Sequence, residues 1–314
     1  MKDTIQELAD TKDTTTATDS ISNLQGKVWL QKILEAAKRR MIFAQFAYET
    51  DLPGGTKDLA LPIYTSNITD WVAQSGATGE GVSRTMTAID NLTTVTFTPV
   101  TYRYGCAIST DVVRTSQVDV VRHAREQLSY YAAYSVESAI EAVIEAASAP
   151  NEVVCGGGAT VDTGNTLDPD AIAEGLRKMR ANSWFSEPAR PFVLVIPAIC
   201  EEALMKDSQF VNASEYGDQH VVLNGEIGKY LGVRVVTSEF CPAKTSGHAK
   251  FEVNGHICFM FKAQVAYGLA WGTKPTLDYE FNKLESEHRV FLDLCYKSET
   301  LQESALVLIY ASDA

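Results

Sequence analysis

The 314-residue sequence lacks the features that mark membrane, secreted and disulfide-rich proteins. No stretch approaches the roughly 18–20 consecutive apolar residues that a membrane-spanning helix needs. The first residues, MKDTIQELAD, carry acidic side chains where a secretory signal has a basic head and an apolar run. The six cysteines are dispersed and form no C-x-x-C pair, so neither a zinc ribbon nor a disulfide framework is indicated. We therefore expect synthesis in the cytoplasm, no membrane partner and reduced thiols.

Positive charge is scarce, because 27 lysines and arginines stand against 40 aspartates and glutamates, for a formal net charge of −13 at pH 7. Proteins that bind nucleic acid through their overall charge need clustered lysine and arginine, so this class is disfavoured. One local exception is an amphipathic helix, which the apolar spacing predicts over residues 27–48. Its basic patch comprises Lys27, Lys32, Lys38, Arg39 and Arg40. Either a solvated helix face or contact with an anionic surface explains this patch.

Catalytic and cofactor-binding signatures are also missing. The triglycine at 156–158 fits neither a P-loop nor a dinucleotide-binding turn, and a hinge is the simpler interpretation. Asp162 lies in a single D-T-G triplet, whereas aspartic-protease chemistry needs two carboxylates that share a proton. His256 and Cys258 alternate on a predicted strand and could reach one metal ion, but a zinc site needs three or four ligands. We expect no enzyme activity, cofactor or metal, and an enzyme that uses Asp162 is a minor alternative.

Two strands flank a long glycine-containing segment in the first third of the chain. LALPIY at 59–64 is a short apolar strand, and the threonine-rich run 94–108 is a longer one that Pro99 interrupts. Glycines and small polar residues between them indicate the tip of an extended arm. A two-stranded arm buries little by itself, so we expect it to lie on another surface. The candidate contact residues near its tip are Trp71, Gly76, Gly79, Glu80, Gly81 and Arg84.

One very long helix is predicted over 110–149, where apolar residues recur every three or four positions until Pro150. Thr110 or Asp111 is the expected N-cap. An unbroken helix of this length would extend roughly 58 Å, at about 1.5 Å per residue. Such a helix suits a spine better than a layer of a compact enzyme.

From residue 155 onward the pattern mixes helices and strands. A helix is expected to begin at Asp168-Pro169 and run to about Ser183, and PFVLVI at 191–196 reads as a strand buried on both faces. The run 224–238 reads as a helix, a turn at Gly232 and a strand. Three further β-like runs lie between 276 and 310. The expected fold class is therefore α+β.

The segment 192–240 contains two distinctive stretches, FVNASEYG and NGEIGKYLGVRVV. Both resemble stretches in the major capsid proteins of tailed bacteriophages and related viruses, which have the Hong Kong 97 (HK97-like) fold. KAQVAYGLAW at 262–271 is similar to the strand that follows in that family. The order of elements fits over roughly residues 28–311, and the sharpest similarity covers about 50 residues.

The resemblance implies a division of the chain into the parts of a capsid subunit. These parts are an N-terminal arm at 1–58, an extended β-hairpin E-loop with flanking strands at 59–108, the long spine helix of a P-domain at 109–154, an α/β A-domain at 155–272 and a return to the P-domain sheet at 273–314. In the family the E-loop reaches over a neighbouring subunit. The A-domain packs around the centre of each hexamer or pentamer.

The function implied is that of a major capsid protein that self-assembles as hexamers and pentamers into an icosahedral shell around the double-stranded DNA genome of a tailed virus. Its expected partners are itself, a separate scaffolding protein, a portal protein and, in some particles, decoration proteins. DNA would be enclosed without sequence-specific binding. The expected location is the virion capsid, and the host cytoplasm before assembly. An encapsulin-like nanocompartment shell that encloses a protein cargo is the alternative.

Departures from other family members refine these expectations. Only about 26 polar residues precede the first predicted helix, too few for the long scaffolding segment of some members. No lysine occurs between Lys57 and Lys178, so the E-loop tip cannot supply the lysine of an isopeptide cross-link. Glu80 and Arg84 are candidates for charge pairs between subunits, and simple solubility explains them equally well. The basic patch is expected on the inner surface, where DNA or an acidic scaffold would lie.

Overall fold

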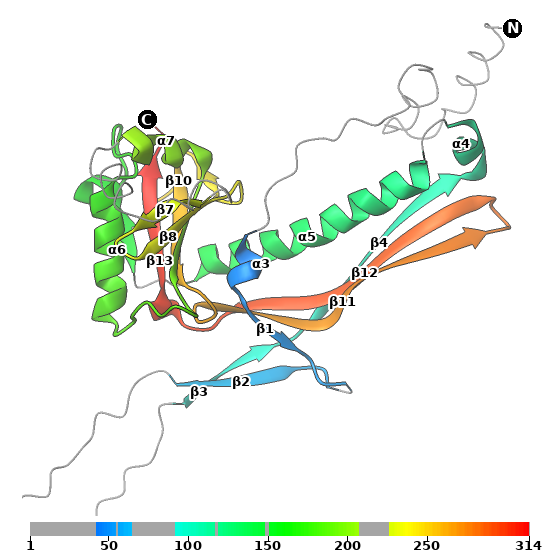
Figure 1. Cartoon of the computed structure of the whole chain (residues 1–314), viewed down its shortest axis with the longest axis horizontal. Coiled ribbons are helices and arrows are strands. Elements are labelled where there is room, and N and C mark those ends of the chain that lie inside the picture. Colours follow the sequence, from blue (N-terminus) through cyan, green and yellow to red (C-terminus); the bar gives the residue numbers. More distant parts are fainter. Residues whose placement is uncertain are drawn as a thin grey trace, which may run out of the picture. The chain divides into compact units, whose positions relative to one another are not determined.

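The computed structural model of the chain describes residues 42–54, 56–64, 92–116, 119–147, 151–206 and 226–313 (Figure 1). They divide into two compact units. The first unit contains the described residues of Thr101–Val136 and Thr273–Cys295. The second unit contains those of Arg40–Val100, Glu137–Gly272 and Tyr296–Ala314. No helix in the described part of the chain is long and apolar enough to cross a membrane.

The second unit is built on a seven-stranded mixed sheet. Its order is β5 (Glu152–Val154), β13 (Leu306–Ser312), β10 (Gly255–Lys262), β6 (Phe192–Ile196), β8 (Val233–Thr237) and β7 (Glu226–Tyr230), and β9 (Ala243–Lys244) also pairs with β10. β6 and β8 are parallel, whereas β10 is antiparallel to both β6 and β13. Every residue of β6 is buried, as its continuous apolar run predicts.

Two helices and two short 3-10 turns accompany this sheet in the second unit. They are α6 (Pro169–Ala181), α7 (Ala198–Lys206), η1 (Cys155–Gly157) and η3 (Glu303–Ala305), and Figure 1 shows α6 alongside the sheet. The Asp168 carboxylate caps α6 by accepting the N–H of Ala171 at 2.7 Å, so the predicted start of this helix is confirmed. Apolar side chains on one face of α6, among them Ile172 and Leu176, pack into the core of the sheet.

The predicted helix in the run 224–238 is wrong, because residues 226–230 form strand β7. β7 pairs antiparallel with β8, and Tyr230 lies opposite Val233. The connecting residues Leu231 and Gly232 have φ values of 49° and 85°. Two successive positive φ values close a tight β-hairpin, and a helix cannot continue through them.

The long helix predicted over 110–149 is divided in two. α4 (Thr110–Thr115) ends where Ser116 adopts an extended backbone, with ψ of 138°. α5 (Val120–Ala146) follows, and the carboxylate of Asp119 accepts the N–H of Arg122 at 3.0 Å. Ser109, and not Thr110 or Asp111, is the N-cap of α4. With 27 residues, α5 spans roughly 40 Å instead of the expected 58 Å.

A four-stranded sheet contains the remaining long strands, in the order β1 (Tyr48–Asp51), β11 (Tyr267–Asn282), β12 (Glu287–Thr300) and β4 (Val100–Ser109). On β12 the side chains of Val290, Leu292 and Leu294 are buried and alternate with less buried ones, as a strand packed on one face requires. β11 continues through Pro275, although the sequence suggested separate runs. Its pairing with β1 ends at Trp271, so the proline lies where that edge needs no N–H donor.

Two shorter segments begin the described chain. α3 (Phe43–Phe46) is a single helical turn flanked by the non-helical residues Ile42 and Ala47, and β1 begins at Tyr48, so the helix predicted over 27–48 is wrong at these positions. Its residues 27–41 lie outside the described residues. β2 (Leu59–Tyr64) and β3 (Leu92–Phe97) form an antiparallel two-stranded ribbon, in which Leu61 lies opposite Val95. The predicted strands around the glycine-containing segment are therefore confirmed, including the interruption at Pro99.

Candidate assembly surfaces

All the candidate contact residues named from the sequence lie outside the described residues. This holds for Trp71, Gly76, Gly79, Glu80, Gly81 and Arg84, and for the basic patch of Lys27, Lys32, Lys38, Arg39 and Arg40. Their roles stay predictions. The described residues nevertheless include the segments that adjoin both groups, and these segments show how each is held by the rest of the second unit.

The β2–β3 ribbon is held by a buried aromatic side chain at its root. Phe97 is fully buried, and its ring packs against Gly268 on β11. A Cβ atom on Gly268 would lie 3.0 Å from Cζ of Phe97 and 3.3 Å from Cδ1 of Leu301, so any larger residue would force this ring to shift. Among the described side chains of the ribbon, Phe97 alone is buried. The ribbon is anchored at one end and is otherwise open.

The open part of the ribbon has one apolar face. Leu59, Leu61 and Ile63 alternate along β2, and Val95 lies opposite Leu61 on β3. These four side chains are half-buried, whereas Ala60 and Pro62 on the other face are exposed. A two-stranded ribbon is at best marginally stable in water without further packing. The ribbon therefore suits a surface that another molecule covers.

A buried carboxylate holds the chain immediately after residue 41. Glu137 lies on α5 and is only 1% exposed. Its two carboxylate oxygens accept the backbone N–H groups of Phe43 at 2.8 Å and Ala44 at 2.9 Å. These N–H groups lie in the first turn of α3, where no helical carbonyl is available to accept them. Glu137 thus fixes the position at which the predicted N-terminal arm joins the second unit.

Further contacts surround the same anchor. The Tyr267 hydroxyl donates to the carbonyl of Phe43 at 2.8 Å, and the N–H of Gln264 donates to the carbonyl of Phe46 at 2.7 Å. The buried ring of Phe43 lies edge-on to Phe259 at 5.7 Å. The anchor therefore combines apolar packing with hydrogen bonds that are protected from water, which makes these bonds costly to break.

Burial raises the pKa of Glu137, although the backbone N–H groups that it accepts act in the opposite direction. The pKa of the neighbouring Tyr267 is also raised, first by burial and then by the charge of Glu137. Glu137 is not among the candidate residues that the sequence motifs indicate. A glutamate between Val136 and Ile140, on the apolar face of a long helix, was the available signal.

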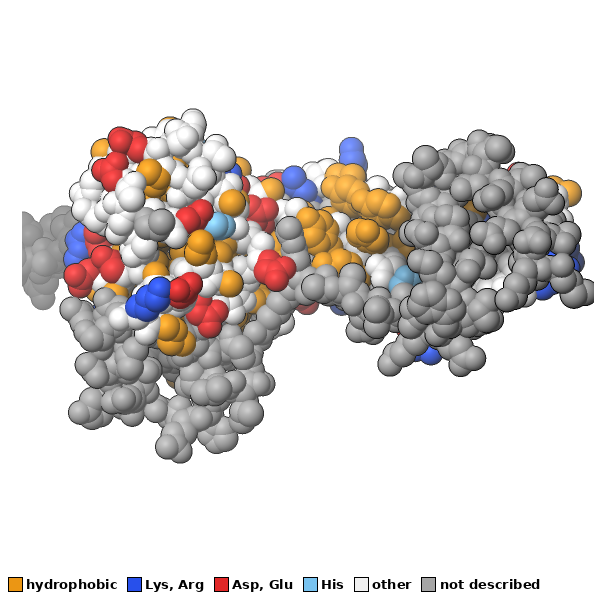
Figure 2. Space-filling model, turned by 90° about the horizontal axis from the view of Figure 1, so that it is seen from above, with side chains coloured by type: hydrophobic (Ala, Val, Ile, Leu, Met, Phe, Trp, Pro, Cys, Tyr) orange, Lys and Arg blue, Asp and Glu red, His pale blue; other side chains and the backbone are white. Residues whose placement is uncertain are grey.

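The first unit exposes aromatic side chains on helix and sheet. Tyr131 on α5 is 56% exposed, and its ring lies 6.0 Å from that of Tyr130. Apolar side chains gather on the surface along α5 in Figure 2. On β11, Tyr279 is exposed and lies under the guanidinium of Arg125 at 5.1 Å, and its hydroxyl contacts His288 at 2.5 Å. Exposed apolar groups of this kind often mark contacts with other proteins.

The residues considered for chemistry form ordinary structural contacts. His256 contacts Asp313 at 2.5 Å, and the thiol of Cys258 lies 3.8 Å from that of Cys200. A hydrogen bond with Glu252 raises the pKa of Asp162 on an exposed loop. Burial and neighbouring groups raise the pKa of the Cys155 thiol to about 12. No group of three or more potential metal ligands occurs among the described residues.

Residues 90–280, more than half of the chain, match a family described as phage capsid protein. The chain belongs to this family. The structure also resembles the capsid of cyanophage Pam1, with a TM-score of 0.71, 16% identity and coverage of 96% of this chain and 99% of that one. The capsid of cyanophage P-SCSP1u gives a TM-score of 0.69 at 15% identity, with 92% of this chain and 93% of that one covered. The acid-stable capsid of Helicobacter pylori bacteriophage KHP30 gives a TM-score of 0.63 at 12% identity, with 95% of this chain and 98% of that one covered.

A search of curated proteins found no relative that matches the sequence. Family membership and structural similarity nevertheless confirm the two main expectations. The fold is the α+β HK97-like capsid fold, and the chain is a phage major capsid protein. The encapsulin-like alternative is not favoured, because the matching family is that of phage capsid proteins.

Proposed function

We propose that this capsid protein assembles as hexamers and pentamers into an icosahedral shell that encloses the double-stranded DNA of a tailed virus, and that it works by association without catalysis. The observation that carries the proposal is the β2–β3 ribbon, in which Phe97 is the one buried side chain among those described and an apolar face is left open. A neighbouring subunit is the simplest cover for such a face. Membership of the phage capsid family supports this assignment.

The proposed partners follow from this shell function. Other copies of the chain would cover the ribbon, and a separate scaffolding protein and a portal protein would direct closure of the shell. Decoration proteins on the outer surface would be an optional addition. DNA would be enclosed without sequence-specific contacts, because the net charge of −13 opposes strong adsorption to the wall. The basic patch at residues 27–40 would face inward. The virion capsid would be the final location, and the host cytoplasm the location before assembly.

Imaging tests the proposal directly. The full-length chain is expressed with and without its neighbouring phage genes, and the products are imaged by electron microscopy and treated with nuclease. We expect closed polyhedral particles with five-fold and six-fold clusters, and nuclease-resistant DNA when the packaging genes are present. Particles that hold a protein cargo and no DNA would instead indicate a nanocompartment. Monomers under all conditions would contradict the proposal.

Denaturing electrophoresis of purified particles gives a second test. The segment between Lys57 and Lys178 contains no lysine, so the E-loop tip cannot form an isopeptide bond through a lysine of its own. We expect the subunits to separate as monomers, whereas a ladder of covalent oligomers would contradict this expectation.

Asp162→Asn should leave particle formation unchanged if the protein has no catalytic role at that position.

A further inference from the structure

Four of the six cysteines lie buried in the second unit. They are Cys155, Cys200, Cys241 and Cys258, and each is at most 6% exposed. All six cysteines of the chain are free thiols. A buried cysteine usually acts as a small apolar side chain, so burial alone indicates nothing about its chemistry. The positions of the sulfur atoms, however, distinguish two of these thiols from the others.

The thiols of Cys200 and Cys258 are in direct contact. Their Sγ atoms lie 3.8 Å apart, and the thiol of Cys258 is the donor. The thiol of Cys241 donates instead to the carbonyl of Val195, at 3.6 Å. A disulfide needs an S–S distance of about 2.05 Å, so the two sulfurs of the contacting pair must approach by roughly 2 Å. Rotation about the side-chain bonds supplies a movement of this size.

The order of strands explains why these two residues meet. β6 and β10 are antiparallel neighbours, and Val195 pairs with Phe259, the residue that follows Cys258. α7 begins two residues after β6 ends, and its buried side chains are Cys200 and Leu204. Both cysteines belong to one cluster of core side chains. The contact is therefore built by the fold, and it joins a surface helix to an inner strand of the sheet.

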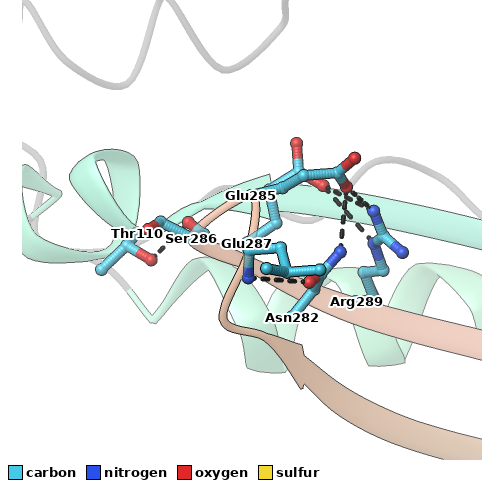
Figure 3. A network of polar contacts seen from close by, with 7 residues as sticks. Thr110, Asn282, Glu285, Ser286, Glu287 and Arg289 are labelled. Atoms are coloured by element: carbon cyan, nitrogen blue, oxygen red, sulfur yellow. Dashed lines mark hydrogen bonds and ion pairs between the residues drawn. The ribbon is translucent and has the colours of Figure 1, made fainter.

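The first unit provides a comparison, because contacts along β4 and β12 set the register of its strands. Thr110, directly after β4, donates to the carbonyl of Ser286, directly before β12 (Figure 3). Further along, Arg103 on β4 pairs with Asp293 on β12 at 3.6 Å. The residue numbers in these two contacts run in opposite directions. The two strands are therefore antiparallel.

This register keeps the two cysteines of the first unit apart. Cys106 lies on β4 and Cys295 on β12. The antiparallel register places Cys295 beside Thr101, five positions along β4 from Cys106. Five residues of strand span roughly 17 Å, which is far beyond the reach of a disulfide. A pair of thiols in contact is thus a feature of α7 and β10 and not of every cysteine in this chain.

The contacting pair is shielded while the fold is closed. A hydrogen bond to the Cys200 sulfur and burial raise the pKa of the Cys258 thiol, which keeps this thiol protonated and unreactive. α7 buries only the side chains of Cys200 and Leu204, so its local opening needs less free energy than opening of the sheet. Opening of α7 brings Cys200 to the solvent, where a small oxidant can reach it.

Hydrogen peroxide is an oxidant small enough for this route. The thiolate of Cys200 attacks one peroxide oxygen, the O–O bond breaks, and a sulfenic acid and one water molecule result. The sulfur of Cys258 then attacks the sulfenic sulfur, and the hydroxyl group leaves with the Cys258 proton as a second water molecule. The two thiols together lose two electrons, and the peroxide is reduced to water.

The surroundings decide when this reaction takes place. Thiols stay reduced in the cytoplasm, whereas disulfides persist outside the cell. We propose that Cys200 and Cys258 form an oxidative modification site, in which hydrogen peroxide outside the cell joins the two thiols in a disulfide that ties α7 to β10. The pairing itself needs no shell. Its timing rests on the proposed function, because a capsid protein leaves the cytoplasm as part of the virion.

Disulfide mapping of the unmodified full-length chain tests the pairing. The protein is purified with a reductant, freed of it, treated with hydrogen peroxide, alkylated and digested without reduction for mass spectrometry. We expect one cross-link, between the peptides that contain Cys200 and Cys258, and four of the six thiols still free. A bridge between other cysteines, a sulfinic acid at Cys200 without a bridge, or six free thiols overturns the proposal.

Thermal unfolding tests whether the bridge ties α7 to β10. The bridge closes a loop over residues 201–257, which lowers the entropy of the unfolded chain. We expect oxidation to raise the unfolding midpoint of the parent by roughly 5–10 °C, and dithiothreitol to reverse the rise. Cys241→Ala, the matched control for a buried thiol, should show the same rise, and Cys200→Ala should show none. An equal rise in Cys200→Ala, or no rise in a bridged parent, contradicts the tie. If a variant does not fold, the mapping of the parent decides.

Particles test the timing and separate this inference from the proposed function. Infected cells lysed directly into an alkylating reagent should yield subunits with six free thiols. Particles treated with hydrogen peroxide after lysis should carry the bridge. A bridge in the first sample, or none in the second, overturns the proposed modification of the virion. If no particles form, the proposed function fails, and the pairing is still decided on the unassembled chain.

Discussion

The two units differ in where their strands bury apolar side chains. In the second unit every residue of β10 except His256 is buried, and every residue of β6 is buried. In the first unit β12 buries Val290, Leu292 and Leu294, but β11 is exposed from Thr273 to Phe281, and Ile108 is the one buried residue of β4. The second unit thus carries a complete core of its own. The first unit and the β2–β3 ribbon depend more on molecules that pack against them.

Removing a core ring of the second unit should have the largest effect on stability. Phe259 is fully buried on β10 and packs against Phe43. We expect Phe259→Ala to lower the free energy of unfolding of the unassembled chain by about 3–5 kcal/mol. Urea unfolding measures this change. A decrease in the free energy of unfolding below about 1 kcal/mol would show that the second unit does not have a self-contained core, and the contrast with the first unit would not hold.

The buried carboxylate on α5 should have the next largest effect. Glu137→Gln leaves one side-chain acceptor for two N–H groups, the buried one of Phe43 and the partly buried one of Ala44. We expect a loss of about 1–3 kcal/mol at neutral pH, measured by urea unfolding. Glu126→Gln is the matched control on the same helix, because Glu126 is exposed and should change stability by no more than about 0.5 kcal/mol. Equal effects of the two substitutions would contradict the anchoring role.

The same residue predicts a pH dependence. Because the pKa of Glu137 is raised in the folded chain, the folded state binds this proton more tightly than the unfolded state does. Its contribution to stability is present below the ordinary glutamate pKa of about 4.3 and is lost as the pH rises through the raised value. Urea midpoints measured across this range should therefore fall less steeply with pH in Glu137→Gln than in the parent. Identical slopes would exclude Glu137 as the titrating group.

A methyl group at the root of the ribbon tests the anchor of β2 and β3. Gly268→Ala places a Cβ atom 3.0 Å from the ring of Phe97. We expect this overpacking to lower the free energy of unfolding by about 1–3 kcal/mol, which thermal unfolding measures. It should also make the ribbon more sensitive to protease. Gly54→Ala is the control, since nothing lies within 4 Å of its Cβ position. If both variants behave like the parent, the root of the ribbon is not packed as described.

The smallest effect on folding is expected in the first unit. Tyr104 on β4 is 47% exposed. Tyr104→Ser should change the stability of the unassembled chain by no more than about 0.5 kcal/mol. Particle yield should nevertheless fall if neighbouring subunits cover this strand. A large loss of stability in the unassembled chain would show that the first unit buries Tyr104 itself.

Some of these features could be predicted from the sequence because they depend on neighbours in the chain. The apolar run of β6, the Asp168 cap of α6 and the paired strands around the glycine-containing segment all have local signals. The break between α4 and α5 also has a local signal, because Asp119 can cap a new helix. The apolar residues keep their helical spacing across the break, however, and therefore suggest one continuous helix. The positive φ at Leu231 is harder to predict, because such residues favour negative φ.

Other features could not be predicted because they depend on residues far apart in the sequence. Glu137 accepts N–H groups from residues more than ninety positions earlier, and Gly268 makes room for a ring on β3. A periodic pattern reports which face of an element is apolar. It does not report which partner covers that face.

Hydrogen exchange, compared between the unassembled full-length chain and assembled particles, tests the central claim most directly. We expect the amides of β2, β3 and the part of β11 from residue 273 to 282 to become strongly protected on assembly. The amides of β6 and β10 should be protected equally in both states, since their core is complete within one chain. Full protection of the ribbon and of this part of β11 in the unassembled chain would contradict the account.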